Sequence, residues 1–193
     1  MLIVLTGPAS SGKDTVQQRL LQHYPSLNRV VTLTTRLPRR GEHDGDEYNF
    51  ISREEFEQKV KDGEFLEYVD FSGDLYGTTK DSLLIADKEG EDLIWRVESS
   101  RAANLEEVLP QDLLDKTVVI YLNTHSWDVL EDRMRARGTS EDKIKERLKK
   151  DKEDLEKYRG KLENIVFNEQ GKIDKTMEQV TKLIDAKKGQ VPT

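Results

Sequence analysis

The sequence has no cysteine among its 193 residues. This absence excludes disulfide bonds, thiolate nucleophiles and metal sites built on cysteine ligands. Long apolar runs are missing as well. The longest, near the N-terminus, has about five residues, far fewer than the roughly 20 that a membrane-spanning helix needs. No basic segment precedes a long apolar stretch, so we expect no secretory signal, no membrane contact and a cytoplasmic location.

Basic residues are fewer than acidic ones, with 31 Lys+Arg against 38 Asp+Glu, and the formal net charge is −7. This balance argues against broad nucleic-acid binding, which needs a basic surface. Hydrophobic residues make up only 35 % of the chain, but they come in periodic blocks, which argues against disorder. The length suits one soluble, globular domain with its own core.

Short apolar segments alternate with longer amphipathic ones along the chain. Strands are predicted at residues 2–6, 29–34, 48–51, 64–71, 93–98, 117–122 and 164–167. Helices are predicted at residues 13–24, 79–89, 100–109, 126–136, 141–159 and 173–187, and between a capping box at Ser52 and Glu55 and a closing Gly63. This alternation predicts right-handed crossovers and an α/β fold with a mostly parallel sheet.

The strand at residues 2–6 is followed by G-x-x-x-x-G-K and then by a helix. Glycines let successive N–H groups turn toward phosphate oxygens, Lys13 adds a positive charge, and the helix N-terminus favours the same anion. The alternative is an ordinary glycine-rich turn. The pattern departs at Asp14, where a P-loop has a Ser or Thr that ligates magnesium. The predicted triphosphate-binding residues are Gly7, Pro8, Ala9, Ser10, Ser11, Gly12, Lys13, Asp14 and Thr15.

A basic cluster follows in this acidic chain, with Arg36, Arg39 and Arg40 close together in TTRLPRRGEHDGDEY. Arginine forks bind phosphate oxygens in a bidentate manner, so the cluster indicates a second anion site. Tyr48, at the start of the next predicted strand, can present its hydroxyl to the same anion. The alternative is a solvated loop whose charges are incidental.

The stretches TTRLPRRGEHDGDEYNFISREEF and GEFLEYVDFSGDLYGTT resemble the nucleotide-monophosphate half of guanylate kinases. With the P-loop before them and RMRARGTSEDKIKERL after them, the resemblance spans roughly residues 2–185. It implies ATP-dependent phosphorylation of GMP, and of dGMP, in purine nucleotide metabolism. The implied cofactor is Mg²⁺, the implied partners are ATP and GMP, and the implied assembly is a monomer or homodimer.

The same resemblance implies a P-loop three-layer fold in one domain over residues 1–193, with an inserted β-rich GMP-binding lobe and a helical lid. The core would comprise about 1–34, 80–125 and 160–190, the acceptor-binding lobe about 35–79, and the lid about 126–159. The implied GMP-binding residues are Thr32, Arg36, Arg39, Tyr48, Glu67, Tyr76, Gly77, Thr78 and Glu98. Of these, the arginines and tyrosines would hold the phosphate, and Glu67 and Thr78 would read the guanine.

The residues themselves support a special role for Glu67. In EFLEYVDF, strict alternation would put Phe65, Glu67 and Val69 on one face, so that a carboxylate points where apolar side chains point. A buried carboxylate needs a partner, and a base with N–H donors is a fitting one. An edge strand with a solvated face is the alternative. The tripeptide Tyr76–Thr78 reads by itself as a turn.

Four arginines follow late in the chain, and a Gly138-Thr139 break divides them: Arg133, Arg135, Arg137 and Arg147. A helix that ends at glycine, followed by a newly capped helix, describes a hinged flap that can carry positive charge to a moving phosphoryl group. Solvated arginines on amphipathic helices are the alternative. The resemblance assigns all but Arg135 to the phosphates. It counts Lys13, Arg39, Arg137 and Arg147 as catalytic, and places Asn168 near the adenine of ATP.

The chain departs from the family pattern around the donor site. Besides Asp14, Arg96 stands where the family has an acidic residue, Glu98 replaces a shorter Asp, and residues 99–101 lack the family's Gln-Gly. GKD and SRA together resemble ribose 1,5-bisphosphate phosphokinases, so a kinase of a sugar phosphate is one alternative. A non-catalytic guanylate-kinase-like binding module is another. We expect Asp14 to pair with Arg96 and to ligate Mg²⁺ directly or through a water; alternatively, Asp14 faces solvent and Arg96 lines another pocket.

Overall fold

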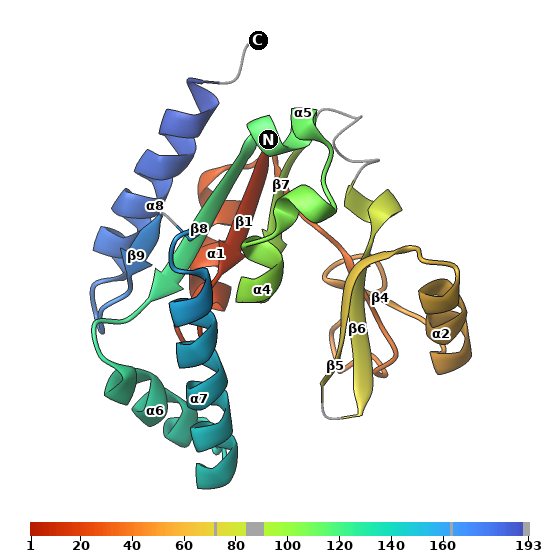
Figure 1. Ribbon diagram of the computed structural model, residues 1–193, viewed down its shortest axis with the longest axis horizontal. Coiled ribbons are helices and arrows are strands. Elements are labelled where there is room, and N and C mark those ends of the chain that lie inside the picture. Colours follow the sequence, from red (N-terminus) through yellow and green to blue (C-terminus); the bar gives the residue numbers. More distant parts are fainter. Residues whose placement is uncertain (72, 84–90, 163, 191–193) are drawn as a thin grey trace. The chain divides into compact units, whose positions relative to one another are not determined.

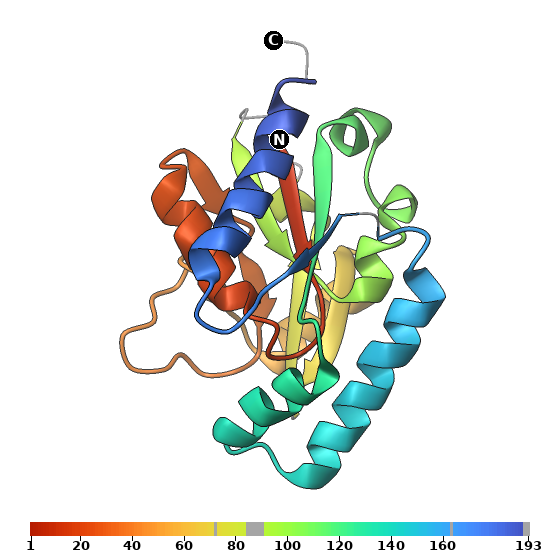
Figure 2. The ribbon, with the colours of Figure 1, turned by 90° about the vertical axis from the view of Figure 1, so that its left-hand side faces the viewer.

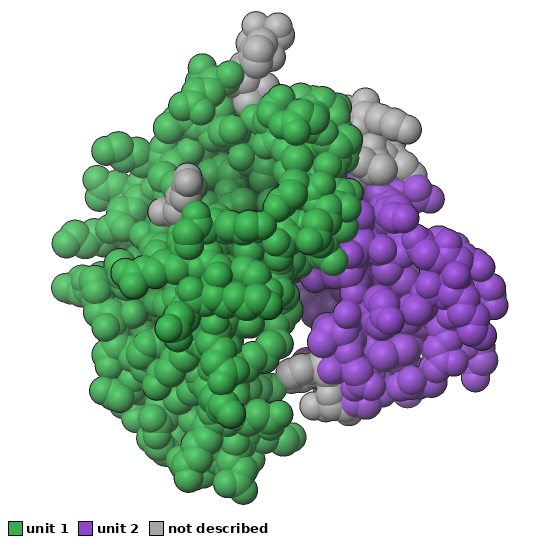
Figure 3. Space-filling model, in the orientation of Figure 1, with its two compact units in different colours: residues 1–27, 94–193 green, residues 28–93 purple. Residues whose placement is uncertain are grey.

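The structure is a computed structural model that describes residues 1–71, 73–83, 91–162 and 164–190 (Figure 1). The chain folds into two compact units, coloured separately in Figure 3. Unit 1 comprises residues 1–27 and 94–193, and unit 2 comprises residues 28–93. No helix in the described ranges is both long and apolar enough to cross a bilayer.

The larger sheet has five strands in the order β2-β7-β1-β8-β9 among the described residues. The strands are β1 (Leu2–Thr6), β2 (Leu27–Arg29), β7 (Asp92–Arg96), β8 (Thr117–Asn123) and β9 (Ile165–Phe167). β8 lies parallel to β1 and to β9, with Leu2 opposite Thr117 and Tyr121 opposite Ile165. The predicted α/β class with a mostly parallel sheet is confirmed, because the helical crossovers return each strand in the same direction.

Helices cover both faces of this sheet within unit 1. They are α1 (Lys13–His23), α4 (Ser99–Ala102), η1 (Leu105–Glu107), α5 (Gln111–Asp115), α6 (Trp127–Ala136), α7 (Glu141–Tyr158) and α8 (Ile173–Lys188). Figure 2 shows α1 and α8 on one face, with α4 and α7 on the other. All five residues of β1 are therefore buried, which explains its uniformly apolar start. The helices α6 and α7 share a small core of their own, formed by Leu130, Met134, Ile144 and Leu148.

Unit 2 contains a four-stranded sheet in the order β4-β3-β6-β5. Its elements are β3 (Thr32–Thr34), β4 (Tyr48–Phe50), α2 (Arg53–Lys61), β5 (Phe65–Phe71) and β6 (Asp74–Thr79). β6 runs antiparallel to β3 and β5, whereas β4 runs parallel to β3. The predicted cap of α2 is confirmed: the Ser52 hydroxyl accepts from the Glu55 N–H at 3.0 Å, and Gly63 adopts φ +68° after the helix.

The structure corrects several predicted elements. The segment 29–34 is two short strands, β2 and β3, and the predicted helix 100–109 is split into α4 and η1. Tyr76–Thr78 lies inside strand β6, because pairing with β3 and β5 on both sides extends what would locally be a turn. α5 was not predicted, and its five residues are too few for a periodic signal. Most of the predicted helix 79–89 lies outside the described residues.

Candidate active site

The loop at residues 7–13 joins β1 to α1, which is the strand–loop–helix context that the motif requires. Gly7 has φ +135°, and a Cβ there would lie 2.1 Å from the carbonyl oxygen of Leu122. Gly12 has φ +102°, and a Cβ there would lie 2.2 Å from Nδ2 of Asn168. Ser10 also adopts a positive φ, of 61°. Both glycines are therefore required by backbone conformation and by close packing.

Lys13 reaches back across this loop. Its ammonium group donates to the carbonyl oxygens of Gly7 and Pro8, each at 2.8 Å. Burial lowers the pKa of Lys13 to about 8, and although the Asp151 carboxylate opposes this shift, the guanidinium groups of Arg96 and Arg137 add to it. A desolvated cation held at a helix N-terminus is a strong attractant for phosphate oxygens.

Asn168 and Arg133, both predicted to bind ATP, donate hydrogen bonds to the backbone of the loop at residues 7–13. The Asn168 amide donates to the carbonyl oxygen of Ser11 at 2.8 Å and accepts from the hydroxyl of Thr176 at 3.2 Å. Arg133 donates to the carbonyl oxygens of Ser10 and Asn168, each at 3.2 Å. These bonds tie the loop to α6 and to the segment after β9, and thereby keep its N–H groups in a fixed array.

Asp151 of α7 is a member of the site that sequence reasoning missed. Its carboxylate accepts a hydrogen bond of 2.9 Å from the N–H of Ala9, in the middle of the loop. Burial raises the pKa of the Asp151 carboxyl above its usual range, although the Ala9 N–H and Lys13 oppose the shift. In the run KKDKEDLEKY nothing separates this aspartate from the solvated acids around it, so only the packing of α7 reveals it.

Asp14 and Arg96 form the predicted ion pair, with Nη1 of Arg96 donating to Oδ1 of Asp14. The pair joins the first turn of α1 to the end of β7. The Asp14 side chain remains 72 % exposed and that of Arg96 35 % exposed. The two residues therefore pair as predicted, while Asp14 also faces solvent, as the alternative had it. Glu98, predicted to contact GMP, lies in unit 1 and its carboxylate accepts from Lys150 at 2.7 Å. Thr15 is exposed on α1.

The late arginines differ in their surroundings. Arg135 is engaged by three acidic side chains, at 2.6 to 3.0 Å, which agrees with its lack of an assigned role: Glu131, Asp132 and Glu141. Arg137 follows α6 directly, just before Gly138 with φ +78°, and influences the pKa of Lys13. Arg147 lies one helical turn before Asp151 on α7, so both occupy the face that reaches the loop.

Unit 2 contains the second predicted anion site, centred on Arg36. Its guanidinium is held in a bidentate manner by the Glu42 carboxylate, at 2.7 and 3.0 Å, and lies 5.1 Å from the ring centroid of Tyr48. Glu42 also accepts from the N–H of Arg39 at 2.7 Å. Because of Arg36, the pKa of Glu42 is held below its usual range. The Arg39 side chain is exposed. An arginine fork with a backbone N–H is a donor set that suits a phosphate group equally well.

The remaining predicted GMP residues lie on β3, β5 and β6 of the same unit. The Tyr76 ring is 5.9 Å from that of Tyr48, and Thr32 faces Tyr48 in the β3–β4 register. Glu67 is half-buried and lies directly opposite the buried Thr78 across β5 and β6. Position 77 requires glycine because a Cβ there would lie 2.6 Å from the Phe65 ring.

Strict alternation in β5, from which the placement of Glu67 was predicted, is wrong. A bulge between Phe65 and Glu67 shifts the register, so Phe65 and Tyr68 both contact the ring of Phe56. Glu67 therefore does not share a face with Phe65, and Val69 is 43 % exposed. A bulge adds one residue to one strand of a pair and reverses the facing of the later residues in that strand.

Comparison with known proteins agrees with these features. The family model described as guanylate kinase matches residues 1–187. A guanylate kinase from Nostoc sp. is 38 % identical over 156 residues, which cover 80 % of this chain and 76 % of that protein. One from Clostridioides difficile is 32 % identical over 192 residues, 99 % of this chain and 90 % of that protein. The crystal structure of guanylate kinase from Anaplasma phagocytophilum has the same fold, with a TM-score of 0.68 at 23 % identity, over 100 % of this chain and 87 % of that one.

The resemblance noted in the sequence is thus confirmed over nearly the whole length of the chain, and it includes both the loop of unit 1 and the arginine cluster of unit 2. By the extent of the family match and the identity to its relatives, this chain belongs to the guanylate kinase family.

Proposed function

We propose that the residues described above carry out the family's reaction, the transfer of the γ-phosphoryl group of ATP to GMP with formation of ADP and GDP, and that dGMP is a second acceptor. The observation that carries this assignment is the glycine-dependent loop around Lys13 in unit 1. In the same chain, unit 2 places the guanidinium of Arg36 over the ring of Tyr48. Because ATP and GMP are intracellular metabolites, the protein would act in the cytoplasm.

In the proposed roles, unit 1 binds the triphosphate. The N–H groups of residues 7–13 and the N-terminus of α1 surround the phosphate oxygens. The Lys13 ammonium has three protons, of which two are donated to loop carbonyl oxygens, so one remains for phosphate. Asn168 and Arg133 keep the loop in this shape. Asp151 must give up the Ala9 N–H, or lie beside the phosphates with a cation between them, because two anions cannot share one donor without a large penalty.

Unit 2 binds the acceptor in the same proposal. Arg36, Arg39, Tyr48 and Tyr76 hold the GMP phosphate, and Arg36 is oriented in advance by Glu42 and by its stacking on Tyr48. Glu67 accepts from the N–H groups of guanine, and Thr78 bonds to its carbonyl side. A phosphate oxygen of GMP attacks the γ-phosphorus of ATP, the bond to the β–γ bridging oxygen breaks, and ADP leaves with the electron pair.

The residues near the loop fit Mg²⁺, the cofactor typical of the family. Magnesium is usually held by one or two carboxylates together with substrate phosphates and water. Asp14 provides an exposed carboxylate at the first turn of α1, and within the described ranges no three acidic or histidine side chains form a separate metal cage. When bound, the ion would neutralise charge on the phosphate oxygens. Asp14 would hold it, directly or through a water, while Arg96 keeps the carboxylate in place.

Residues 126–159, which contain α6 and α7, form the proposed lid. Arg137 and Arg147 would place positive charge on the phosphoryl group during transfer and help to exclude water, since such charge is most effective in the transition state. The two helices share a small core, against which Ala9 of the loop also packs, so they can move as one body.

The proposal is tested by measuring GDP formation for the wild type, for Lys13→Ala and for the exposed control Lys149→Gln on α7. We expect Lys13→Ala to abolish turnover without loss of folded structure by circular dichroism, and the control to behave as wild type. Because the pKa of Lys13 is about 8, ATP affinity should weaken as pH rises above that value. Near-normal activity of Lys13→Ala, or a preference for ribose 1,5-bisphosphate over GMP, would overturn the assignment.

A further inference from the structure

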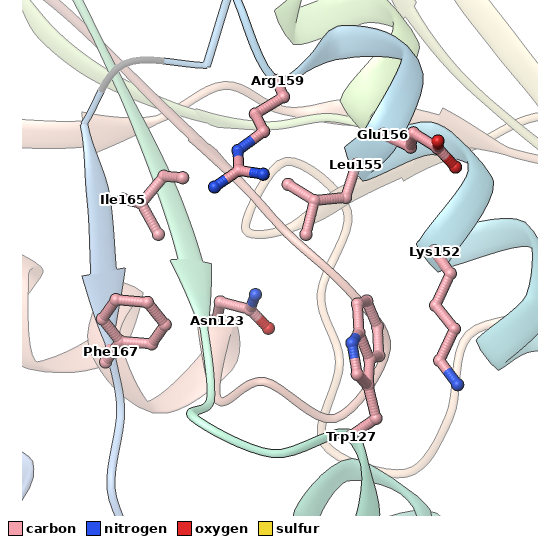
Figure 4. A pocket seen from close by; sticks show the side chains of 8 residues that line it. All are labelled: Asn123, Trp127, Lys152, Leu155, Glu156, Arg159, Ile165 and Phe167. Atoms are coloured by element: carbon pink, nitrogen blue, oxygen red, sulfur yellow. The ribbon is translucent and has the colours of Figure 1, made fainter.

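Unit 1 contains a cavity of about 420 Å³ that none of the predicted ATP or GMP residues lines (Figure 4). It lies between the ends of β8 and β9 and the helices α6 and α7. Asn123 contributes from β8, and its predecessor Leu122 belongs to the core on the α1 side of the sheet. Since neighbouring strand residues point to opposite faces, Asn123 faces away from α1, toward α7.

The walls of the cavity are aromatic on two sides. Phe167 of β9 has one ring face stacked on His125, with centroids 4.2 Å apart and an interplanar angle of 11°, yet the residue remains 37 % exposed. Trp127 of α6 lies across the cavity from Phe167, with Leu155 of α7 between them at the top (Figure 4). Two aromatic walls with an aliphatic roof form the apolar environment that a flat ring fills best.

A buried amide provides the first specific polar contact. Asn123 is only 7 % exposed, and its Oδ1 accepts from the N–H of Thr124 at 2.8 Å. Within the described part of the chain its Nδ2 has no hydrogen-bond partner, and Figure 4 shows the amide directed into the cavity. Nδ2 therefore offers a hydrogen bond to an acceptor on a bound molecule.

A guanidinium provides the second polar contact. Arg159 directly follows α7, three residues after Glu156, a spacing that allows an ion pair. No such pair forms between these two described residues; instead the guanidinium extends over the cavity, while the Glu156 carboxylate points away from it (Figure 4). Lys152 lies over the Trp127 ring at 5.4 Å rather than against Glu156. Among the described residues Arg159 forms no ion pair, so the mouth of the cavity presents an arginine fork.

We propose that this cavity binds a small aromatic anion, separately from ATP and GMP. The flat ring lies between Phe167 and Trp127, a carboxylate or phosphate on the ring is held by Arg159, and Asn123 donates to an acceptor on the same molecule. An arginine fork favours planar carboxylate and phosphate groups over neutral ones. Trp127 and Arg159 belong to the proposed lid, but neither is assigned a contact with ATP or GMP, so the site adds a ligand class to the protein.

The binding test uses the fluorescence of Trp127, which a nitroaromatic probe quenches on contact. The only other tryptophan, Trp95, is 1 % exposed and supplies a constant background. The probes are 4-nitrobenzoate and 4-nitrophenyl phosphate, which separate the carboxylate from the phosphate source, with neutral nitrobenzene as the matched control. Saturating ADP and GMP are present so that the nucleotide sites are occupied.

The variants are Arg159→Gln, which removes the charge, and Lys149→Gln, an exposed control on the same helix. We expect saturable quenching of the wild type by at least one anion, and roughly tenfold weaker binding in Arg159→Gln, about 1.4 kcal/mol. Nitrobenzene affinity should be the same in the wild type and in Arg159→Gln. No saturable quenching up to about 10 mM, equal anion affinity in Arg159→Gln and wild type, or markedly tighter probe binding when ADP and GMP are omitted would overturn the proposal.

Discussion

The ion pair between Asp14 and Arg96 allows a quantitative prediction about the donor site. The two side chains are 72 % and 35 % exposed, so solvent screens much of their attraction. Exposed pairs contribute about 0.2–1 kcal/mol, and the partial burial of Arg96 favours the upper end of this range. A double-mutant cycle with Asp14→Ser and Arg96→Met should therefore give a coupling energy of about 1 kcal/mol in urea unfolding. Each substitution removes the interaction without adding a new charge.

The control cycle uses Lys149 and Glu153, an exposed pair on α7 at 3.9 Å, for which roughly 0.3 kcal/mol is expected. A coupling below about 0.5 kcal/mol for Asp14 and Arg96 would mean that the two sites are independent and would refute the reasoning.

A second measurement on the same pair concerns enzymatic activity. Asp14→Ser combined with Arg96→Asp restores the family pattern at both positions, so GMP kinase activity should be kept or raised. Loss of a sugar-phosphate kinase activity, with none gained toward GMP, would instead support the alternative acceptor.

Three further predictions test the other proposed roles. If Glu67 accepts from guanine N–H groups, AMP cannot supply those donors to this half-buried carboxylate, and kcat/KM for AMP should fall below that for GMP by up to roughly 10⁴-fold; comparable values would contradict the role. Arg137→Ala and Arg147→Ala should each lower kcat by roughly 10³-fold with little change in GMP affinity, whereas normal kcat with weaker binding would make them positioning groups. Asp151→Asn keeps the shape of the side chain but removes the negative charge at the Ala9 N–H, so the Kd for ATP measured by calorimetry should fall about tenfold. An unchanged or higher Kd would show that Asp151 does not oppose the triphosphate.

The phosphate-binding loop and the cap of α2 could be predicted from the sequence because they depend on neighbouring residues. A buried strand, a loop with glycines at the first and sixth positions and a lysine are constraints within about a dozen neighbouring residues, and the structure places them as predicted. The cap at Ser52 is equally local. The Asp14–Arg96 pair, 82 residues apart, was predictable for another reason: an anion placed beside a phosphate site needs a cation, and Arg96 was a charge out of place on a central strand.

Only the tertiary structure decided where the chain's many other charged residues act. With 36 % charged residues, Asp151 and Arg159 cannot be told from their solvated neighbours by pattern. Asp151 meets Ala9 across 142 residues, because α7 packs beside the loop, and Arg159 covers a cavity that exists only where α7 passes β8 and β9. Likewise Tyr76–Thr78 lies in a strand because it pairs with β3, about 40 residues earlier, and the bulge between Phe65 and Glu67 appears only in the pairing of β5 with β6. Contacts between distant segments are set by packing of whole elements, which side-chain periodicity does not encode.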